Sequence, residues 1–272
     1  FSLEVAWRPV IRNGLGGDLA NSFLAIAARE AGEVVEREVL AWHFAVERDR
    51  RYAKRTVFRV REDGVWVEPQ PLADGGLKRD ELPPAGKEQL AMHLAPTRFQ
   101  PGELWHHALL SILNEPGWTA DQVARWAARW LSCLEGLHPA VVGRPEGLDT
   151  VLPGWLLDAV PRNMIVDGAE ARFIDLEWEL PDGVTLGHLC YRAIVQSLTG
   201  VASVAAPASE TDLSPLHVFE HCMVALGFGA VGARLSDWHD RERAFQILAT
   251  GVDIPRDLSA VADTRLAMRR GG

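Results

Sequence analysis

The chain has 272 residues, 47% of them hydrophobic and 24% charged, which is the ordinary balance of a globular protein with one large domain or two lobes. Its net charge of −9 argues against a broad surface for nucleic acid or anionic membrane. No stretch approaches the roughly 18 uninterrupted apolar residues of a membrane span, and the start lacks the pattern of a signal peptide. Three widely spaced cysteines, Cys133, Cys190 and Cys222, indicate free thiols in a reducing cytoplasm.

The first segment combines a loosely alternating run with a glycine cluster. Residues 3–11 alternate in the manner of a strand, and Pro9 would confine that strand to a sheet edge. Gly14, Gly16 and Gly17 follow, before the apolar run 22–28. Because glycine lacks a Cβ and exposes its N–H, this cluster could cover a bound phosphate, or it could be a plain turn.

The next segment is predicted to be a β-sheet. Residues 40–46, 55–60 and 65–68 have the composition of strands, and the turn 62–64 joins the last two. Lys54 precedes the second strand beside several arginines, and it could be a phosphate ligand or a solvated residue at a strand edge. Residues 69–87 are rich in Pro and Gly and predict a loop, and 86–94 predicts a helical run that contains Glu88, a candidate partner for Lys54.

Two helices are expected at 103–115 and 119–137. In the second, apolar residues recur at intervals of three and four, and Thr119 with Gln122 forms a capping box. Its tryptophans could stack on a ligand, but this spacing favours the core. His106 and His107 do not predict a metal site, because adjacent helical side chains point about 100° apart.

The central stretch, 152–179, concentrates polar residues around a predicted hairpin. Asp158 and Asn163 precede the apolar run 164–166, and a turn at Asp167-Gly168 leads to a second run, 172–174, which ends on Asp175. The hairpin would return Asp175 to the side where Asn163 begins the first strand. Oxygen ligands gathered in this way suit Mg²⁺. The alternative is a solvent-facing hairpin with ordinary turn residues.

Helices near 186–199, 214–227 and 236–249 complete the chain. His217 and His221, with Glu220, match a His-x-x-Glu-His zinc-hydrolase motif, and on a helix the two histidines would share a face. The surrounding pattern is that of a packed amphipathic helix, so zinc remains a secondary alternative.

The order Asp-x-x-Pro-x-Asn, an apolar strand and a strand ending in Asp resembles the catalytic and metal-binding loops of protein kinase-like and aminoglycoside phosphotransferases. The resemblance implies that Asp158 is the base, that Asn163 and Asp175 hold Mg²⁺, and that Lys54 and Gly14, Gly16 and Gly17 contact ATP. The sequence departs from the family at Leu156 and Leu157, which replace His-Arg or His-Gly, at Val160, and after Asp175, where Leu-Glu replaces Phe-Gly.

Segments 21–27, 42–58 and 173–178 resemble a kinase-like region found behind methyltransferase or glycosyltransferase domains in bacterial O-antigen (lipopolysaccharide) assembly. The resemblance implies a two-lobed α+β fold, with a β-rich lobe at 1–100 and a helical lobe at 101–272.

It also implies Mg-ATP-dependent phosphorylation of a sugar or glycan hydroxyl in the cytoplasm, or at the inner face of the inner membrane. The alternative is a degenerate module that positions a methyltransferase or glycosyltransferase partner domain or binds glycan. Because the chain begins at Phe1, we expect it to be a fragment of a larger protein.

Overall fold

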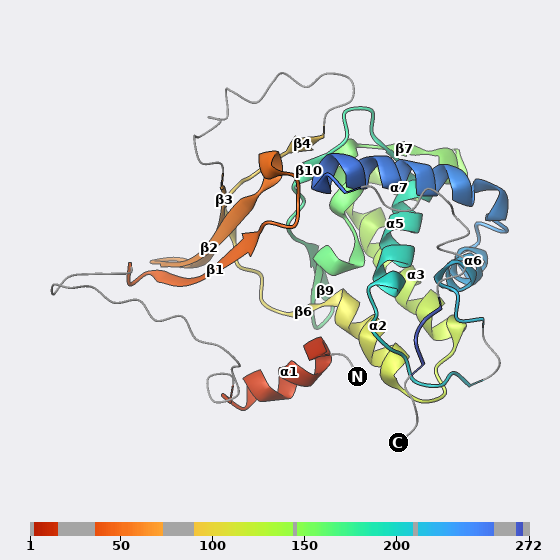
Figure 1. The fold of residues 1–272 in the computed structure, drawn as a ribbon, viewed down its shortest axis with the longest axis horizontal. Coiled ribbons are helices and arrows are strands. Elements are labelled where there is room, and N and C mark those ends of the chain that lie inside the picture. The colour runs from red at the N-terminus through yellow and green to blue at the C-terminus, as the bar shows by residue number, and fades with distance from the viewer. Residues whose placement is uncertain are drawn as a thin grey trace. The chain divides into compact units, whose positions relative to one another are not determined.

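The computed structural model describes residues 3–15, 36–72, 90–143, 146–208, 212–252 and 265–268 (Figure 1). These residues form two compact units. One contains the described residues up to Leu72 together with 94–100, and the other contains 90–93 and the described residues from Pro101 onward. Antiparallel sheets and helices are both present, which confirms the predicted α+β class.

The first unit contains a four-stranded sheet in the order β1-β2-β3-β5. Its strands are β1 (Val39–Ala45), β2 (Lys54–Arg61), β3 (Gly64–Pro71) and β5 (Thr97–Arg98), and each neighbouring pair is antiparallel. The three predicted strands and the predicted turn are therefore confirmed. Arg61 pairs with Gly64 across the turn, and Gly64 has a φ of 127°, which favours glycine.

The prediction of a strand at 3–11 is wrong, because this segment is the helix α1 (Leu3–Arg12). Leu3, Trp7, Val10 and Ile11 are spaced i, i+4, i+7 and i+8, which is helical periodicity rather than alternation. Gly14, whose φ is 70°, lies just beyond the last residue of the helix and caps it, and the Leu15 N–H donates to the Val10 carbonyl as in a Schellman cap.

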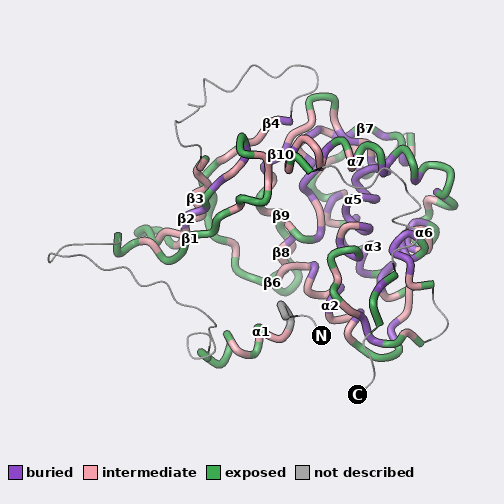
Figure 2. Tube along the Cα trace, viewed as in Figure 1, coloured by how far each residue is buried: buried purple, intermediate pink, exposed green. Residues whose placement is uncertain are grey.

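The second unit is built on helices, which lie in the predicted places except for the short helix α4, which was not predicted (Figure 1). They are α2 (Trp105–Asn114), α3 (Ala120–Leu137), α4 (Pro139–Gly143), α5 (Leu186–Thr199), α6 (Pro215–Ala225) and α7 (Leu235–Thr250). The capping box of Thr119 and Gln122 is present at the start of α3. Trp126 and Trp130 are buried, which confirms that they belong to the core. Figure 2 shows that buried residues concentrate on α3 and α5, the central helices of this core.

Short strands connect the helices of the second unit. They are β6 (Glu103–Leu104), β8 (Met164–Asp167) and β9 (Glu170–Phe173) in one sheet, β4 (Ala91–Met92) with β10 (Trp178–Glu179), and β7 (Val151–Leu152) with β11 (Val184–Thr185). The helical prediction for 86–94 is wrong at Ala91–Met92, since this dipeptide gains backbone hydrogen bonds from β10. Glu88 lies outside the described residues.

Short 3₁₀ turns complete this unit, among them η2 (Gly147–Asp149), η3 (Gly154–Asp158), η4 (Pro161–Asn163) and η5 (Gly232–Arg234); η1 (Arg50–Tyr52) lies in the other unit. The cysteines are free thiols, and Cys190 and Cys222 are buried. Within the described ranges, none of the helices is long and apolar enough to span a membrane.

Candidate functional site

The site is built on the loop that carries Asp158. This residue ends η3, and its carbonyl oxygen accepts hydrogen bonds from the Val160 N–H at 2.7 Å and from the Asn163 carboxamide nitrogen at 3.0 Å. The Trp130 indole of α3 donates to the next carbonyl, that of Ala159, at 2.7 Å. Because Trp130 and Ala159 are fully buried, these bonds hold the loop to the core.

The predicted hairpin is present and returns the chain to Asn163. Met164 pairs with Phe173 in the antiparallel β8–β9 ladder, and the Ile174 N–H donates to the Asn163 carbonyl at 2.7 Å. Gly168 occupies the turn with a φ of 59°. Asp175 therefore follows directly after the residue that pairs with Asn163, as the sequence predicted.

Asp175 has an unusual backbone. Among the described residues other than glycine, it alone has a positive φ, 53°. A left-handed conformation costs an L-residue roughly 1–2 kcal/mol, and Asp tolerates it better than most residues. Such strain is concentrated at functional sites in proteins. Asp175 is an exposed residue that follows the hairpin.

The Asp158 carboxyl group, by contrast, is buried, with a relative exposure of 4%. One of its oxygens lies 3.3 Å from the Arg192 guanidinium, and the other accepts a long bond of 3.4 Å from the Trp178 N–H. Burial raises the pKa of Asp158, Arg192 lowers it, and the carboxylates of Glu177 and Asp175 raise it again, so that it reaches about 6. The negative charges of Asp175 and Glu177 therefore act on the Asp158 carboxyl group.

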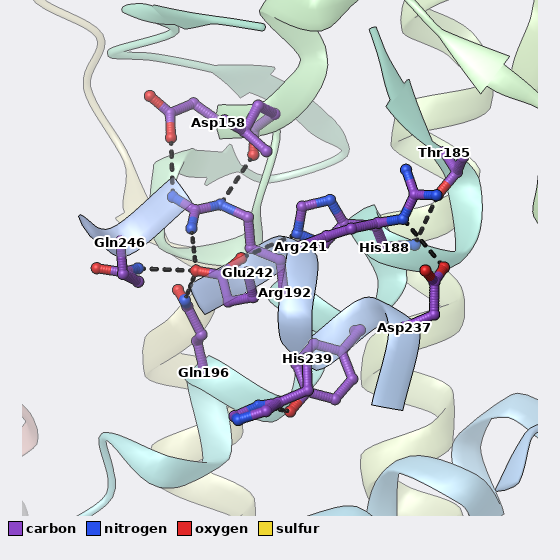
Figure 3. Close-up of polar contacts among 12 residues, drawn as sticks. Asp158, Thr185, His188, Arg192, Gln196, Asp237, His239, Arg241, Glu242 and Gln246 are labelled. Carbon is purple, nitrogen blue, oxygen red and sulfur yellow. Dashed lines mark hydrogen bonds and ion pairs between the residues drawn. The ribbon is translucent and has the colours of Figure 1, made fainter. Parts of the chain in front are cut away.

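Arg192 belongs to a buried polar network between α5 and α7, which Figure 3 shows. Glu242 of α7 accepts hydrogen bonds from Arg192 at 2.7 Å, from His188 at 3.2 Å, from Gln246 at 2.7 Å and from Gln196. Burial alone would raise the pKa of Glu242, but Arg192 and His188 outweigh it and lower the pKa to about 2. Glu242 is thus a buried carboxylate that stays ionised.

The remaining predicted ATP ligands lie in the first unit or outside the description. Lys54 begins β2 and is 2% exposed, which differs from a solvated strand edge. Gly14 caps α1, and Gly16 and Gly17 lie outside the described residues, as does the apolar run 22–28.

The zinc alternative has little support from the geometry. His221 bonds to Asp121 at 2.7 Å, and His217 lies 4.0 Å from Asp212. Across the described parts of the chain, no three His, Cys, Asp or Glu side chains form a group that could hold a metal. The carboxylates near Asn163 therefore do not make a closed metal cage either.

From the sequence alone we did not identify Trp130, Arg192 and Glu242 as the residues whose hydrogen bonds hold the Asp158 loop in place. Arg192 did carry a signal, because it is the lone charge between Leu189 and Val195 in an otherwise apolar helical run. Glu242 carried none, since charged residues surround it in α7. Its burial is decided by packing alone.

Comparisons of the chain with protein-family models, with curated proteins and with solved structures returned no significant match.

Proposed function

We propose that this chain is a Mg²⁺- and ATP-dependent phosphotransferase that acts on a sugar or glycan hydroxyl in bacterial surface polysaccharide assembly, with a two-lobed kinase-like fold and a cytoplasmic location. The observation that carries the proposal is the strained Asp175 at the end of the β8–β9 hairpin, one position beyond the partner of Asn163. The proposed acceptor, a sugar or glycan hydroxyl, comes from the resemblance of the sequence to kinase-like regions of O-antigen assembly proteins.

The donor set fits Mg²⁺. The Asn163 nitrogen donates to the Asp158 carbonyl, so its carboxamide oxygen is the atom left to serve as a ligand, and the exposed Asp175 carboxylate is the second. Mg²⁺ is usually bound by one or two carboxylates, with waters and substrate phosphates completing its shell, so no closed cage is needed. When bound, Mg²⁺ supplies positive charge to the β- and γ-phosphates.

Asp158 is the proposed base. The Asn163 carboxamide is hydrogen-bonded to the Asp158 backbone, so the two residues are neighbours. The raised pKa of Asp158, about 6, would let its carboxylate accept a hydroxyl proton near neutral pH. The Trp178 N–H orients one carboxylate oxygen from a distance of 3.4 Å. Lys54, at the start of β2, is the proposed partner of the nucleotide phosphates, because the resemblance of the sequence to kinase-like phosphotransferases implies a lysine at this place.

A second candidate is a degenerate module that positions a methyltransferase or glycosyltransferase domain or binds glycan. The burial of Asp158 and the engagement of both its oxygens favour this candidate, since a base must reach its substrate. Leu156 and Leu157, both buried, also differ from the residues that phosphotransferases use before the base.

Calorimetry with Mg-ATP, followed by measurement of phosphate release and of phosphoryl transfer to sugars, separates the candidates. For a phosphotransferase, Asp158→Asn should keep nucleotide affinity but lose about 100-fold to 10,000-fold in turnover. Asp175→Asn should lose affinity for Mg-ATP. Asp167→Asn, at the exposed turn of the same hairpin, is the matched control and should change neither quantity.

Binding of Mg-ATP without turnover, unchanged in Asp158→Asn, would support the degenerate module instead. If the wild-type protein shows neither heat nor a thermal shift with millimolar Mg-ATP, the phosphotransferase proposal fails.

A further inference from the structure

Arg192 makes three hydrogen bonds that point in different directions (Figure 3). Its Nε donates to the Leu157 carbonyl at 3.1 Å, one terminal nitrogen donates to the Asp158 carboxylate at 3.3 Å, and the other donates to Glu242 at 2.7 Å. Two of the three bonds therefore end on the loop that carries the proposed base, and the third ends on α7.

The orientation of Arg192 is itself constrained. Its guanidinium lies over the Phe245 ring, 4.2 Å from the centroid, and Phe245 contacts Trp178 edge-on at 6.1 Å. Glu242, which accepts from Arg192, is held by three further side chains of α5 and α7. Because Arg192 is 7% exposed and Glu242 is 2% exposed, water cannot readily replace these bonds.

A buried ion pair of this kind is weak evidence for a contribution to stability. Taking two charges out of water costs several kcal/mol, and apolar replacements of similar volume are often neutral. What the pair does provide is a fixed direction for its hydrogen bonds, since a planar guanidinium holds its donors in a rigid fork whereas a lysine ammonium does not.

We infer that Arg192, oriented by Glu242, is a positioning residue that sets the backbone at Leu157 and the direction of the Asp158 carboxylate. The charged groups around that carboxylate are Arg192 from α5, Glu242 behind it on α7, and Asp175 and Glu177 from the segment after β9. The catalytic meaning of the inference rests on the proposed phosphotransfer, but its structural content does not.

Three variants test the inference. Arg192→Lys keeps the positive charge beside Glu242 but loses the fork. Arg192→Met with Glu242→Gln removes both charges of the pair, so that no Glu242 carboxylate stays buried without its guanidinium, as it would in Arg192→Met alone. The buried Asp158 carboxyl group also loses Arg192 in this variant, but it keeps the Trp178 N–H, and its raised pKa of about 6 lets it take up a proton. Tyr191→Phe is the control, because the neighbouring Tyr191 hydroxyl bonds to His239 of α7, between the same two helices, rather than to a residue of the loop.

The first readout is amide hydrogen exchange by NMR at Ala159, Val160 and Trp178, which does not depend on any activity. Loss of the fork should accelerate exchange at these amides by about 10-fold in both Arg192 variants, since a lost hydrogen bond changes local opening by about 1.4 kcal/mol. Tyr191→Phe should leave these amides unchanged. Exchange that is unchanged in both Arg192 variants overturns the inference.

The second readout applies to phosphoryl transfer. Arg192→Lys should lower kcat by about 10-fold to 100-fold with the KM for Mg-ATP within about 2-fold, because misplacing a reacting group by about 1 Å can cost that much. A raised KM with unchanged kcat overturns the inference. If the wild-type protein lacks turnover, the proposed function fails while hydrogen exchange still decides the positioning role.

Discussion

Asp175 combines an acidic side chain with a backbone that favours glycine. Its φ of 53° places it in the left-handed region, and the residue before it is paired with Asn163. The backbone conformation of Asp175 therefore costs free energy, while its carboxylate is needed for the proposed Mg²⁺ site. These two effects can be separated by substitution, because glycine, asparagine and alanine differ in both respects.

Asp175→Ala should lower the free energy of unfolding by about 1 kcal/mol, since alanine tolerates positive φ less well than aspartate. Asp175→Gly and Asp175→Asn should stay close to the wild-type protein in stability. All three should lose affinity for Mg-ATP, because each removes the carboxylate. Urea unfolding followed by tryptophan fluorescence, with calorimetry, measures both quantities. Equal stabilities for alanine and glycine would contradict the strain argument.

At the scale of elements, η3 is held against the segment after β10 with no space for a larger residue. A Cβ at Gly154, the first residue of η3, would overlap the carbonyl oxygen of Leu180, a backbone atom that cannot turn aside. The loop that ends at Asp158 therefore depends on a glycine at its start.

Gly154→Ala should destabilise the protein by about 2 kcal/mol or more, because backbone must shift to relieve the overlap. Gly136→Ala, on the exposed face of α3 where nothing lies within 4 Å of the added methyl group, is the control and should stabilise by about 0.5 kcal/mol. Chemical denaturation measures both. A neutral Gly154→Ala would show that the loop adapts freely.

The helix α3 also supports this loop. Trp130 donates to Ala159 at 2.7 Å, whereas Trp126 on the same helix donates to the Trp105 carbonyl at 3.0 Å, away from the loop. Two tryptophans of one helix thus allow a paired comparison.

Trp130→Phe and Trp126→Phe should each lower stability by about 1–3 kcal/mol, since each leaves a backbone carbonyl without its indole donor. Only Trp130→Phe should accelerate amide exchange at Val160 and lower phosphoryl transfer, if the chain transfers phosphate. The stabilities come from urea titrations and the exchange from NMR. Equal loop exchange in the two variants would mean that Trp130 is a core residue without a role in the loop.

At the scale of the whole molecule, buried charge makes stability depend on pH. Glu242 has its pKa lowered from 4.5 to about 2 by Arg192 and His188 against the effect of burial, so its contribution is present above pH 4.5 and is lost as the pH falls towards 2. Asp158 acts in the opposite sense, because its raised pKa makes its contribution fade as the pH rises from 3.8 to about 6.

The wild-type protein should therefore lose about 3 kcal/mol of stability between pH 4.5 and pH 2 through Glu242 alone. Glu242→Gln should lack this part of the loss, although it should be less stable at neutral pH because Arg192 loses a charged partner. Denaturation curves for the two proteins at several pH values give the difference. Parallel acid dependences would show that Glu242 is not held ionised by the fold.

Most elements could be predicted because their signals are local. The β2–β3 and β8–β9 hairpins follow from short β-prone runs joined by glycine turns, and α3 from its periodicity and capping box. The strand prediction for residues 3–11 is wrong because the apolar residues of so short a segment fit both the alternation of a strand and the spacing of a helix, and Pro9 is unusual inside a helix. The strand at Ala91–Met92 was missed because its partner, β10, is far away in the chain.

The sequence by itself determined the hairpin, and with it the adjacency of Asn163 and Asp175, because turn chemistry and strand pairing act over about ten residues. Only the tertiary structure decided the environment of Asp158. Its burial, its raised pKa and its contact with Arg192 depend on residues 34 positions away, and Glu242 lies a further 50 positions beyond Arg192. Such partners are selected by how α5 packs against α7, and a charged residue in a helix carries no local signal of that packing.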